Sequence, residues 1–206
     1  MDASRIACAY DLLAERWLDD QFNQANGIEQ HRRALAFLAD ESGREADSWA
    51  LNVGCGCNTR FNPLMHARGL KIEGIDLSER MLALARAADP EVVLHHADAV
   101  SWQPQRQYRF ITAWDSIWHV QLAEQCALLR KLMHALTPGG IFIFSSGGLD
   151  EPGEHVDTYM GPGLYYGSLG IPRLLDAVAE AGCLCRHLEF DQYPQKHLYI
   201  IVQRAA

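Results

Sequence analysis

The sequence has 206 residues, of which 49% are hydrophobic and 21% are charged, values close to the average of globular proteins. Its length suits one domain with a substantial core, and its composition excludes a disordered chain or a fibrous repeat. The formal net charge of -8 argues against nucleic acid as a partner, because such a chain repels a phosphate backbone.

No segment of the sequence has the pattern of a targeting signal or a membrane span. Apolar runs stay well short of the roughly 20 residues that cross a bilayer. Residues 1–10 also lack a basic region followed by an apolar stretch. We therefore expect a cytoplasmic protein with no membrane partner, present as a monomer or a homodimer.

The spacing of cysteine and histidine does not indicate a metal site. Cysteines occur at 55 and 57 and at 183 and 185, a C-x-C rather than the C-x-x-C spacing of zinc sites. Strand alternation points Cys183 and Cys185 to one face, and it points His95 and His96 to opposite faces. A chain of this length does not need disulfides, so we expect free thiols packed in the core and no bound metal.

Two helices are predicted at the N-terminus, over residues 4–18 and 28–40, because apolar residues recur there at helical spacing. A turn at 23–27 joins them, and together they make residues 1–47 a helical cap. From residue 49 onward, strand-length apolar runs alternate with helical patterns. Strands are predicted at 49–53, 71–76, 91–96, 110–114 and 141–144. One helix follows the glycine-rich turn and ends at 68, and two more are predicted at 79–88 and 121–136.

Apolar strands without polar alternation, separated by helices, indicate an α/β fold with a doubly wound parallel sheet. The tail departs from this pattern. After a helix at 171–181, strands at 183–190 and 197–203 are joined by so short a turn that they must be antiparallel. Residues 148–170 are rich in glycine and lack periodicity, so we expect a long loop that acts as a lid. The core then spans 48–204 within one domain, 1–206.

A candidate ligand site lies where the first strand feeds a glycine turn, Gly54–Cys55–Gly56. Open parallel sheets bind ligands at the carboxyl ends of their strands. A dinucleotide fingerprint would place a third glycine where Thr59 stands, which disfavours pyrophosphate binding and a nicotinamide oxidoreductase. Asp76 ends the second strand, where its carboxylate can accept hydrogen bonds from both hydroxyls of a ribose.

Five segments carry a resemblance to a known family: LNVGCG (51–56), EGIDLSERMLALAR (73–86), HHADAV (95–100), FITAWDSIWHV (110–120) and LTPGGIFIF (136–144). In order and spacing they resemble the successive motifs of class I S-adenosylmethionine-dependent methyltransferases. The resemblance covers residues 48–204. It implies a seven-stranded Rossmann-like sheet of order 3-2-1-4-5-7-6 with the last strand antiparallel. It also implies S-adenosyl-L-methionine as cofactor and methyl transfer to a small-molecule acceptor by in-line displacement.

The resemblance also implies roles for individual residues. Gly54 and Gly56, with Cys55 between them, would flank the methionine part of the cofactor. Asp76 would bind the ribose. The remaining cofactor contacts are Leu77 on a face of the adenine, Asp98 and Ala99 at the adenine amine and Tyr10 over the cofactor carboxylate. Apart from the resemblance, Trp114 is a candidate cofactor contact, because its ring could lie beside the positively charged sulfonium or a flat acceptor.

Two residues depart from the family pattern. Asn52 replaces the acidic residue common two positions before the first glycine, and Asn58 replaces the glycine usual two positions after the second. Asn52 keeps hydrogen-bonding ability without the charge, and Asn58 tolerates positive φ better than most residues. These departures keep open an alternative: a catalytically degenerate protein that binds S-adenosylmethionine or S-adenosylhomocysteine without transferring a methyl group.

Few catalytic side chains are required, because positioning the acceptor against the methyl group can supply much of the rate. Asp115 and His119 follow the fourth strand and are the candidates for a general base, although a histidine there is equally typical of a cap or a packing residue. Trp118 could form an aromatic wall with Trp114, or both could be core residues. In the 148–170 segment, three tyrosines are candidates for the acceptor pocket: Tyr159, Tyr165 and Tyr166.

Overall fold

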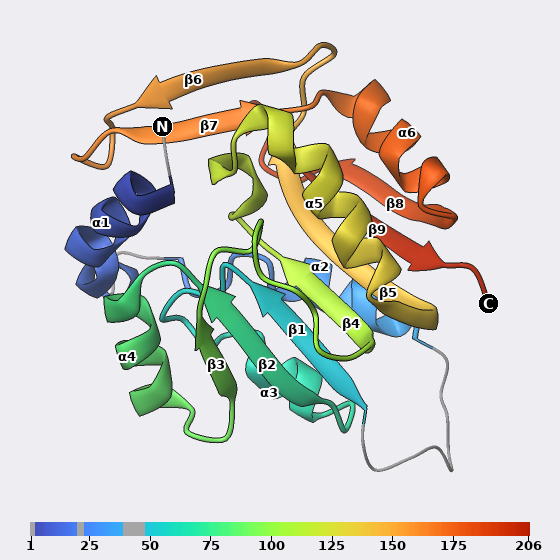
Figure 1. Ribbon diagram of the computed structural model, residues 1–206, viewed down its shortest axis with the longest axis horizontal. Helices are drawn as coiled ribbons and strands as arrows, with labels where there is room; N and C mark the ends of the chain where they lie inside the picture. The colour runs from blue at the N-terminus through green and yellow to red at the C-terminus, as the bar shows by residue number, and fades with distance from the viewer. Residues whose placement is uncertain (1–2, 20–22, 39–47) are drawn as a thin grey trace.

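The computed structural model describes residues 3–19, 23–38 and 48–206. Seven strands form one mixed sheet in the order β3-β2-β1-β4-β5-β9-β8 (Figure 1). The strands are β1 Trp49–Val53, β2 Lys71–Asp76, β3 Val93–His96, β4 Tyr108–Ala113, β5 Leu136–Gly147, β8 Cys183–Phe190 and β9 His197–Arg204. Strands β1 to β5 are parallel, and β9 runs antiparallel to both β5 and β8. Because β6 and β7 lie outside this sheet, the order is the predicted 3-2-1-4-5-7-6.

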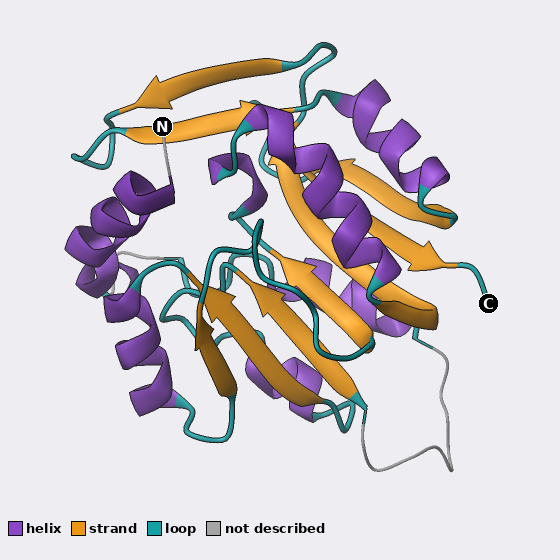
Figure 2. Ribbon diagram, viewed as in Figure 1, coloured by secondary structure: helices purple, strands orange, loops and turns teal. Residues whose placement is uncertain are grey.

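Helices cover both faces of the sheet, as predicted for a doubly wound fold (Figures 1 and 2). Helices α5 (Leu122–His134) and α6 (Ile171–Glu180) lie on one face, and α2 (Ile28–Ala36) and α3 (Asn62–His66) lie on the other. Helix α4 (Glu79–Ala88) packs at the edge beside α1 (Ala3–Leu13), which continues into the short 3-10 helix η1 (Ala14–Leu18).

The strands are apolar on both faces because each face has its own core. Leu51, Ile111 and Leu129 belong to the core under α5 and α6, and all are fully buried. Phe110 and Met65 belong to the core under α2 and α3 and are equally buried. A sheet clamped in this way holds the carboxyl ends of its strands as a rigid rim, which suits a site built on them.

A buried histidine ties α2 to the sheet. Helix α2 begins after Gly27, whose φ is 84°. The Nδ1 atom of His31 donates to the Gly27 carbonyl at 2.7 Å, and Nε2 is 2.7 Å from the Thr112 hydroxyl on β4. Burial lowers the pKa of His31 to about 3, so the ring is neutral near pH 7.

Several predicted bounds were wrong. The helix expected over 4–18 divides into α1 and η1, and the helix expected over 28–40 ends at Ala36, with residues 39–40 outside the described part of the chain. The helix after the glycine turn ends at His66 rather than at 68. The strand expected at 141–144 is longer, because β5 already begins at Leu136, where its pairing with β4 is irregular.

The segment 148–170 is not the long loop that the sequence predicted. Strands β6 (Gly153–Asp157) and β7 (Leu164–Ser168) form a separate antiparallel hairpin, seen along the top of Figure 1. Glycine hides the strand pattern here because it contributes neither polarity nor bulk. At Gly167 it has a packing role, since a Cβ atom there would lie 2.7 Å from the Tyr165 hydroxyl.

All six cysteines are free thiols, as predicted. Cys183 is buried but Cys185 is exposed, so the prediction that both pack in the core was wrong. An irregularity of β8 between Cys185 and His187 interrupts the strand pairing there. The Nε2 atom of His95 donates to the Glu73 carboxylate, and the Nε2 atom of His96 donates to the Leu77 carbonyl. Among the described residues, no group of three or more His, Cys, Asp or Glu side chains is arranged to hold a metal ion.

Candidate active site

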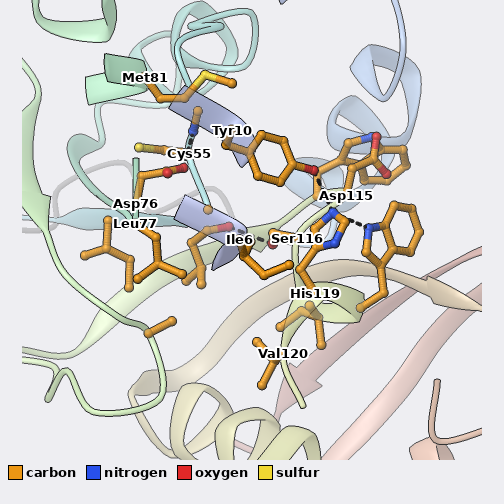
Figure 3. Close-up of a pocket in the computed structure, with 18 of the residues that line it drawn as sticks. Ile6, Tyr10, Cys55, Asp76, Leu77, Met81, Asp115, Ser116, His119 and Val120 are labelled. Atoms are coloured by element: carbon orange, nitrogen blue, oxygen red, sulfur yellow. Dashed lines mark hydrogen bonds between the residues drawn. The ribbon is translucent and has the colours of Figure 1, made fainter. Parts of the chain in front are cut away.

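A cavity of about 320 Å³ opens at the carboxyl ends of β1, β2 and β4. Helix α1 and residues of the hairpin, Met160 and Tyr166, contribute to its walls. Figure 3 shows Asp76 and Leu77 on one side of this cavity and Asp115 and His119 on the other. Of the residues predicted from the sequence, the cavity is lined by Tyr10, Gly54, Cys55, Gly56, Asp76, Leu77, Asp98, Ala99, Trp114, Asp115, Trp118, His119 and Tyr166.

The glycine turn after β1 forms the floor of the cavity with its backbone. Gly54 and Gly56 have φ values of 65° and 58°, which residues with a side chain rarely adopt. The amides of Gly54 and Cys55 both donate to the Ile75 carbonyl, at 2.8 and 3.1 Å. A Cβ atom on Gly54 would lie 2.4 Å from the Cβ of Ser116. Glycine at this position therefore lets the chain pass close to the loop after β4 while leaving room for a ligand.

Asp76, at the end of β2, is the carboxylate at one end of the cavity. One of its oxygens accepts from the Gly56 amide at 2.8 Å and the other from the Ser78 amide at 2.8 Å. Burial raises the pKa of Asp76, and these backbone donors act in the opposite direction. Since each carboxylate oxygen has two lone pairs, both oxygens keep acceptor capacity toward the cavity. This pair of acceptor oxygens fits the two hydroxyls of a ribose.

Apolar side chains surround the space next to Asp76. Leu77 and Met81 come from β2 and α4, and Ala99 and Val100 from the loop after β3. That loop is held by Lys131 of α5, whose Nζ donates to the carbonyls of residues 99, 100 and 102 at 2.6 to 2.8 Å. Asp98 accepts from its own loop, at the Val100 amide, at 2.9 Å. The result is a narrow apolar slot with polar edges, which suits a purine base.

His119, the candidate base, has its hydrogen bonds already assigned by its neighbours. Its Nδ1 donates to the Tyr165 carbonyl at 2.8 Å, because a carbonyl can only accept. Its Nε2 accepts from the Trp118 indole at 3.0 Å and from the Tyr10 hydroxyl at 2.6 Å. Burial lowers the pKa of His119 to about 4, so the ring is neutral, with a single tautomer near pH 7.

Asp115, the second candidate, lies in a left-handed backbone conformation, with φ of 54°. Among the described residues, all the others with positive φ are glycines. Asn58 does not adopt this conformation, and its side-chain oxygen accepts from the Arg60 backbone amide at 2.9 Å. A residue strained by about 1 to 3 kcal/mol is typical of functional sites, where the surroundings hold it in place.

The structure does not bring every predicted residue to the cavity. Tyr159 is 92% exposed at the tip of the hairpin. Tyr165 is buried, but its hydroxyl donates to Glu154 at 2.7 Å and accepts from the Leu122 amide at 3.0 Å, outside the cavity lining. These contacts attach β7 to β6 and to the start of α5. Of the three tyrosines, Tyr166 alone lines the cavity, because neighbouring residues of a strand point to opposite sides.

Other lining residues were not predicted. Ile6 and Trp17 come from the N-terminal helices, Arg60 from the loop before α3 and Ser116 from the loop after β4. The Nε of Arg60 donates to the Asn26 carbonyl at 2.8 Å, and burial lowers the pKa of its guanidinium. The amphipathic pattern of residues 4–18 contained a signal for the apolar contacts, but nothing local marked Arg60 or Ser116.

The fold and the cavity together define a Rossmann-like enzyme whose site combines a carboxylate suited to a ribose with an apolar slot suited to a base. Residues 23–165 match the family model described as a methyltransferase domain, which is more than half of the chain. The chain therefore belongs to the methyltransferase-domain family, within the class I methyltransferases that use S-adenosylmethionine.

Relatives of known name support this assignment. A dTDP-3-amino-3,6-dideoxy-alpha-D-glucopyranose N,N-dimethyltransferase of Streptomyces fradiae is 34% identical over 130 residues, covering 61% of this chain and 50% of the relative. A ubiquinone biosynthesis O-methyltransferase of Pseudoalteromonas translucida is 25% identical over 154 residues, covering 71% and 63%. The chain thus spans about half to two thirds of the length of these curated relatives.

A solved structure shows the same fold. The 1,6-didemethyltoxoflavin-N1-methyltransferase of Burkholderia thailandensis, with bound 1,6-didemethyltoxoflavin and S-adenosylhomocysteine, superposes with a TM-score of 0.69. The match covers 99% of this chain and 89% of the other at 16% identity.

Proposed function

We propose that this protein transfers a methyl group from S-adenosylmethionine to a small molecule by in-line displacement. The observation that carries the proposal is the cavity itself: it holds Asp76 and the apolar slot on one side and a group of polar and aromatic side chains on the other. A cofactor and an acceptor can therefore meet within one space. When bound, the cofactor supplies a methyl group on a positively charged sulfur.

The chain's own residues hold the cofactor in this proposal. Asp76 accepts hydrogen bonds from the ribose hydroxyls, and Leu77 and Ala99 pack on the base. The turn from Gly54 to Gly56 leaves room for the methionine part. Asn52 lines the same cavity and is 6% exposed, so it can provide an uncharged hydrogen bond there.

His119 acts through Tyr10 rather than as a free base. Because Nε2 of His119 already accepts two hydrogen bonds, it does not present a free lone pair to an acceptor. Because Nε2 accepts the hydrogen bond from the Tyr10 hydroxyl, the lone pairs of that hydroxyl point away from His119. Tyr10 then offers an oriented hydrogen-bond acceptor in the cavity, and His119 is its positioning residue.

A small acceptor suits the dimensions of the site. A cavity of about 320 Å³ lies at the small end of the range typical of ligand pockets. Helix α1 and the β6–β7 hairpin enclose it, and we propose that the hairpin segment 148–170 opens and closes as a lid. The names of the relatives include both nitrogen and oxygen acceptors, so they support methyl transfer to a small molecule without naming one.

The test is release of S-adenosylhomocysteine from the purified protein supplied with S-adenosylmethionine and an acceptor library, read by mass spectrometry. We expect turnover with at least one compound. Gly54→Val serves as the inactive control, because a side chain there has unfavourable φ and meets Ser116. Tight binding of S-adenosylhomocysteine with no turnover across a broad library would support the degenerate binding protein instead.

The remaining expectations concern the setting of the protein. No helix among residues 3–19, 23–38 and 48–206 is long and apolar enough to cross a membrane. A cytoplasmic location, a monomeric or homodimeric state and a one-domain organisation over 1–206 are part of the proposal. Gel filtration with light scattering would determine the oligomeric state.

A further inference from the structure

The loop after β4 places a carboxylate in the cavity wall and supports it from behind. Asp115 accepts from Nε2 of His197 at 2.9 Å and from the Ser145 hydroxyl at 3.1 Å, both on one oxygen. Its other oxygen accepts from the side-chain amide of Asn26 at 3.2 Å. A carboxylate has about four lone-pair sites, so three donors leave one for the cavity that Asp115 lines.

His197 is itself held on its far side. Its Nδ1 is 2.5 Å from a carboxylate oxygen of Asp191, and the other oxygen of Asp191 accepts from Gln30 at 2.7 Å. The side chains of His197 and Asp191 are only 8% and 5% exposed. With a carboxylate at each nitrogen, both nitrogens act as donors, which makes the ring an imidazolium. Burial opposes this charge, but the two carboxylates outweigh it and raise the pKa of His197.

Aromatic rings line the cavity near His197. The Trp118 ring is 5.5 Å from the His197 ring and 6.1 Å from the Tyr166 ring, and Tyr166 is 4.8 Å from His119. Trp118, His119 and Tyr166 all line the cavity with Asp115. Aromatic rings and a carboxylate in the wall of one cavity are groups that proteins use to bind organic cations.

The chemistry of the neighbours disfavours a hydroxyl acceptor. An alcohol must lose its proton as it is methylated, but the accepting nitrogen of His119 is in use, and Asp115 is already held by three donors that include the imidazolium of His197. An amine reacts as its neutral form, which has lost its proton to solvent before the methyl transfer, so the transfer step itself needs no base from the protein. The structure thus offers a group that stabilises a positive nitrogen rather than one that removes a proton.

We propose that the methyl acceptor is a small primary or secondary amine, and that Asp115, positioned by His197 and Asp191, faces the reacting nitrogen. This inference rests on the proposed methyl transfer. The nitrogen lone pair forms the new N–C bond while the C–S bond breaks and its electron pair stays on sulfur. The amine keeps its hydrogens, so the positive charge passes from sulfur to nitrogen, opposite Asp115. The carboxylate therefore stabilises the transition state more than it stabilises the bound neutral amine.

Among the described residues, three other carboxylates line the cavity: Asp76 and Asp98 lie by the slot for the base, and Glu124 is an exposed residue of α5. Arg60 lines the same cavity and is a cation, which suits the carboxylate of the methionine part of the cofactor. Asp76 lies across the cavity, beside the slot for the base. The ammonium group of the methionine part is the competing partner for Asp115, so the experiment must separate binding of cofactor product from binding of acceptor.

The experiment uses the full chain saturated with S-adenosylhomocysteine and titrates matched probes by calorimetry: benzylamine against benzyl alcohol, and cyclohexylamine against cyclohexanol. We expect each amine to bind at least about tenfold more tightly than its alcohol. Asp115→Asn should abolish this preference and leave S-adenosylhomocysteine affinity unchanged. Asparagine keeps the shape and tolerates positive φ, so the fold is expected to survive. His197→Gln should reduce the preference in part, and Asp176→Asn on the exposed side of α6 should not affect it.

Three results would overturn the inference. The first is equal binding of amine and alcohol, or binding of neither, by the wild-type protein. The second is loss of S-adenosylhomocysteine affinity in Asp115→Asn, which would make Asp115 a cofactor contact. The third is methylation of hydroxyl or carboxyl compounds in the library with no amine product, which would leave the proposed methyl transfer standing. A protein that fails to bind S-adenosylhomocysteine at all would instead contradict the proposed function. If Asp115→Asn does not fold, the preference of the wild-type protein for amine over alcohol still tests the inference.

Discussion

Replacing Asp76 with alanine tests the cofactor site most directly. The carboxylate accepts the Gly56 and Ser78 amides, one on each oxygen, and keeps a lone pair on each oxygen for a ribose hydroxyl. A hydrogen bond to a charged group is worth about 1.5 to 3 kcal/mol. Loss of two such bonds corresponds to about 3 to 6 kcal/mol, or roughly a 10² to 10⁴-fold weaker affinity for S-adenosylhomocysteine.

Calorimetry with S-adenosylhomocysteine measures this affinity, and circular dichroism checks the fold of each variant. Asp76→Asn retains one acceptor oxygen of the same shape and should show an intermediate loss. Asp176→Ala, an exposed carboxylate on α6 outside the cavity, is the matched control. Unchanged affinity in a folded Asp76→Ala protein would remove Asp76 from the site and refute the placement of the ribose beside β2.

Three further predictions follow from particular contacts. Tyr10→Phe and His119→Asn should each lower turnover, and His119→Asn should keep S-adenosylhomocysteine affinity. The double variant should lose little more than either single one, with a coupling of about 0.5 to 3 kcal/mol; additive losses would show that the two residues act independently. Below pH 6.5 the unfolded chain binds a proton at His31 that the folded chain, with its pKa of about 3, does not. Unfolding free energy should therefore fall by about 2 kcal/mol between about pH 7 and pH 5, and urea denaturation of His31→Asn should show a weaker pH dependence. If residues 148–170 act as a lid, hydrogen exchange in the hairpin should slow when S-adenosylhomocysteine and an acceptor bind, and equal exchange in all states would exclude closure.

Patterns among residues near one another in the sequence were enough to predict most of the fold and half of the site. Apolar runs alternating with helical patterns predicted the doubly wound sheet, because strands covered on both faces must be apolar throughout. The glycine turn and Asp76 could be predicted because they end neighbouring strands of a parallel sheet, which brings them to one edge. The hairpin of β6 and β7 escaped this reasoning, since its glycines interrupt the alternation that indicates a strand.

The other half of the site was decided by tertiary structure. Tyr10 contacts His119 across 109 positions, and Asp115 contacts His197 across 82. Periodicity reports which face of a segment is buried, but it does not report which distant side chain meets it there. The sequence alone marked His119 as a candidate base; only its Tyr10 and Trp118 contacts show that its accepting nitrogen is in use. His197 had no local signal of any kind, because its role exists only where the antiparallel strand β9 passes behind the loop that follows β4.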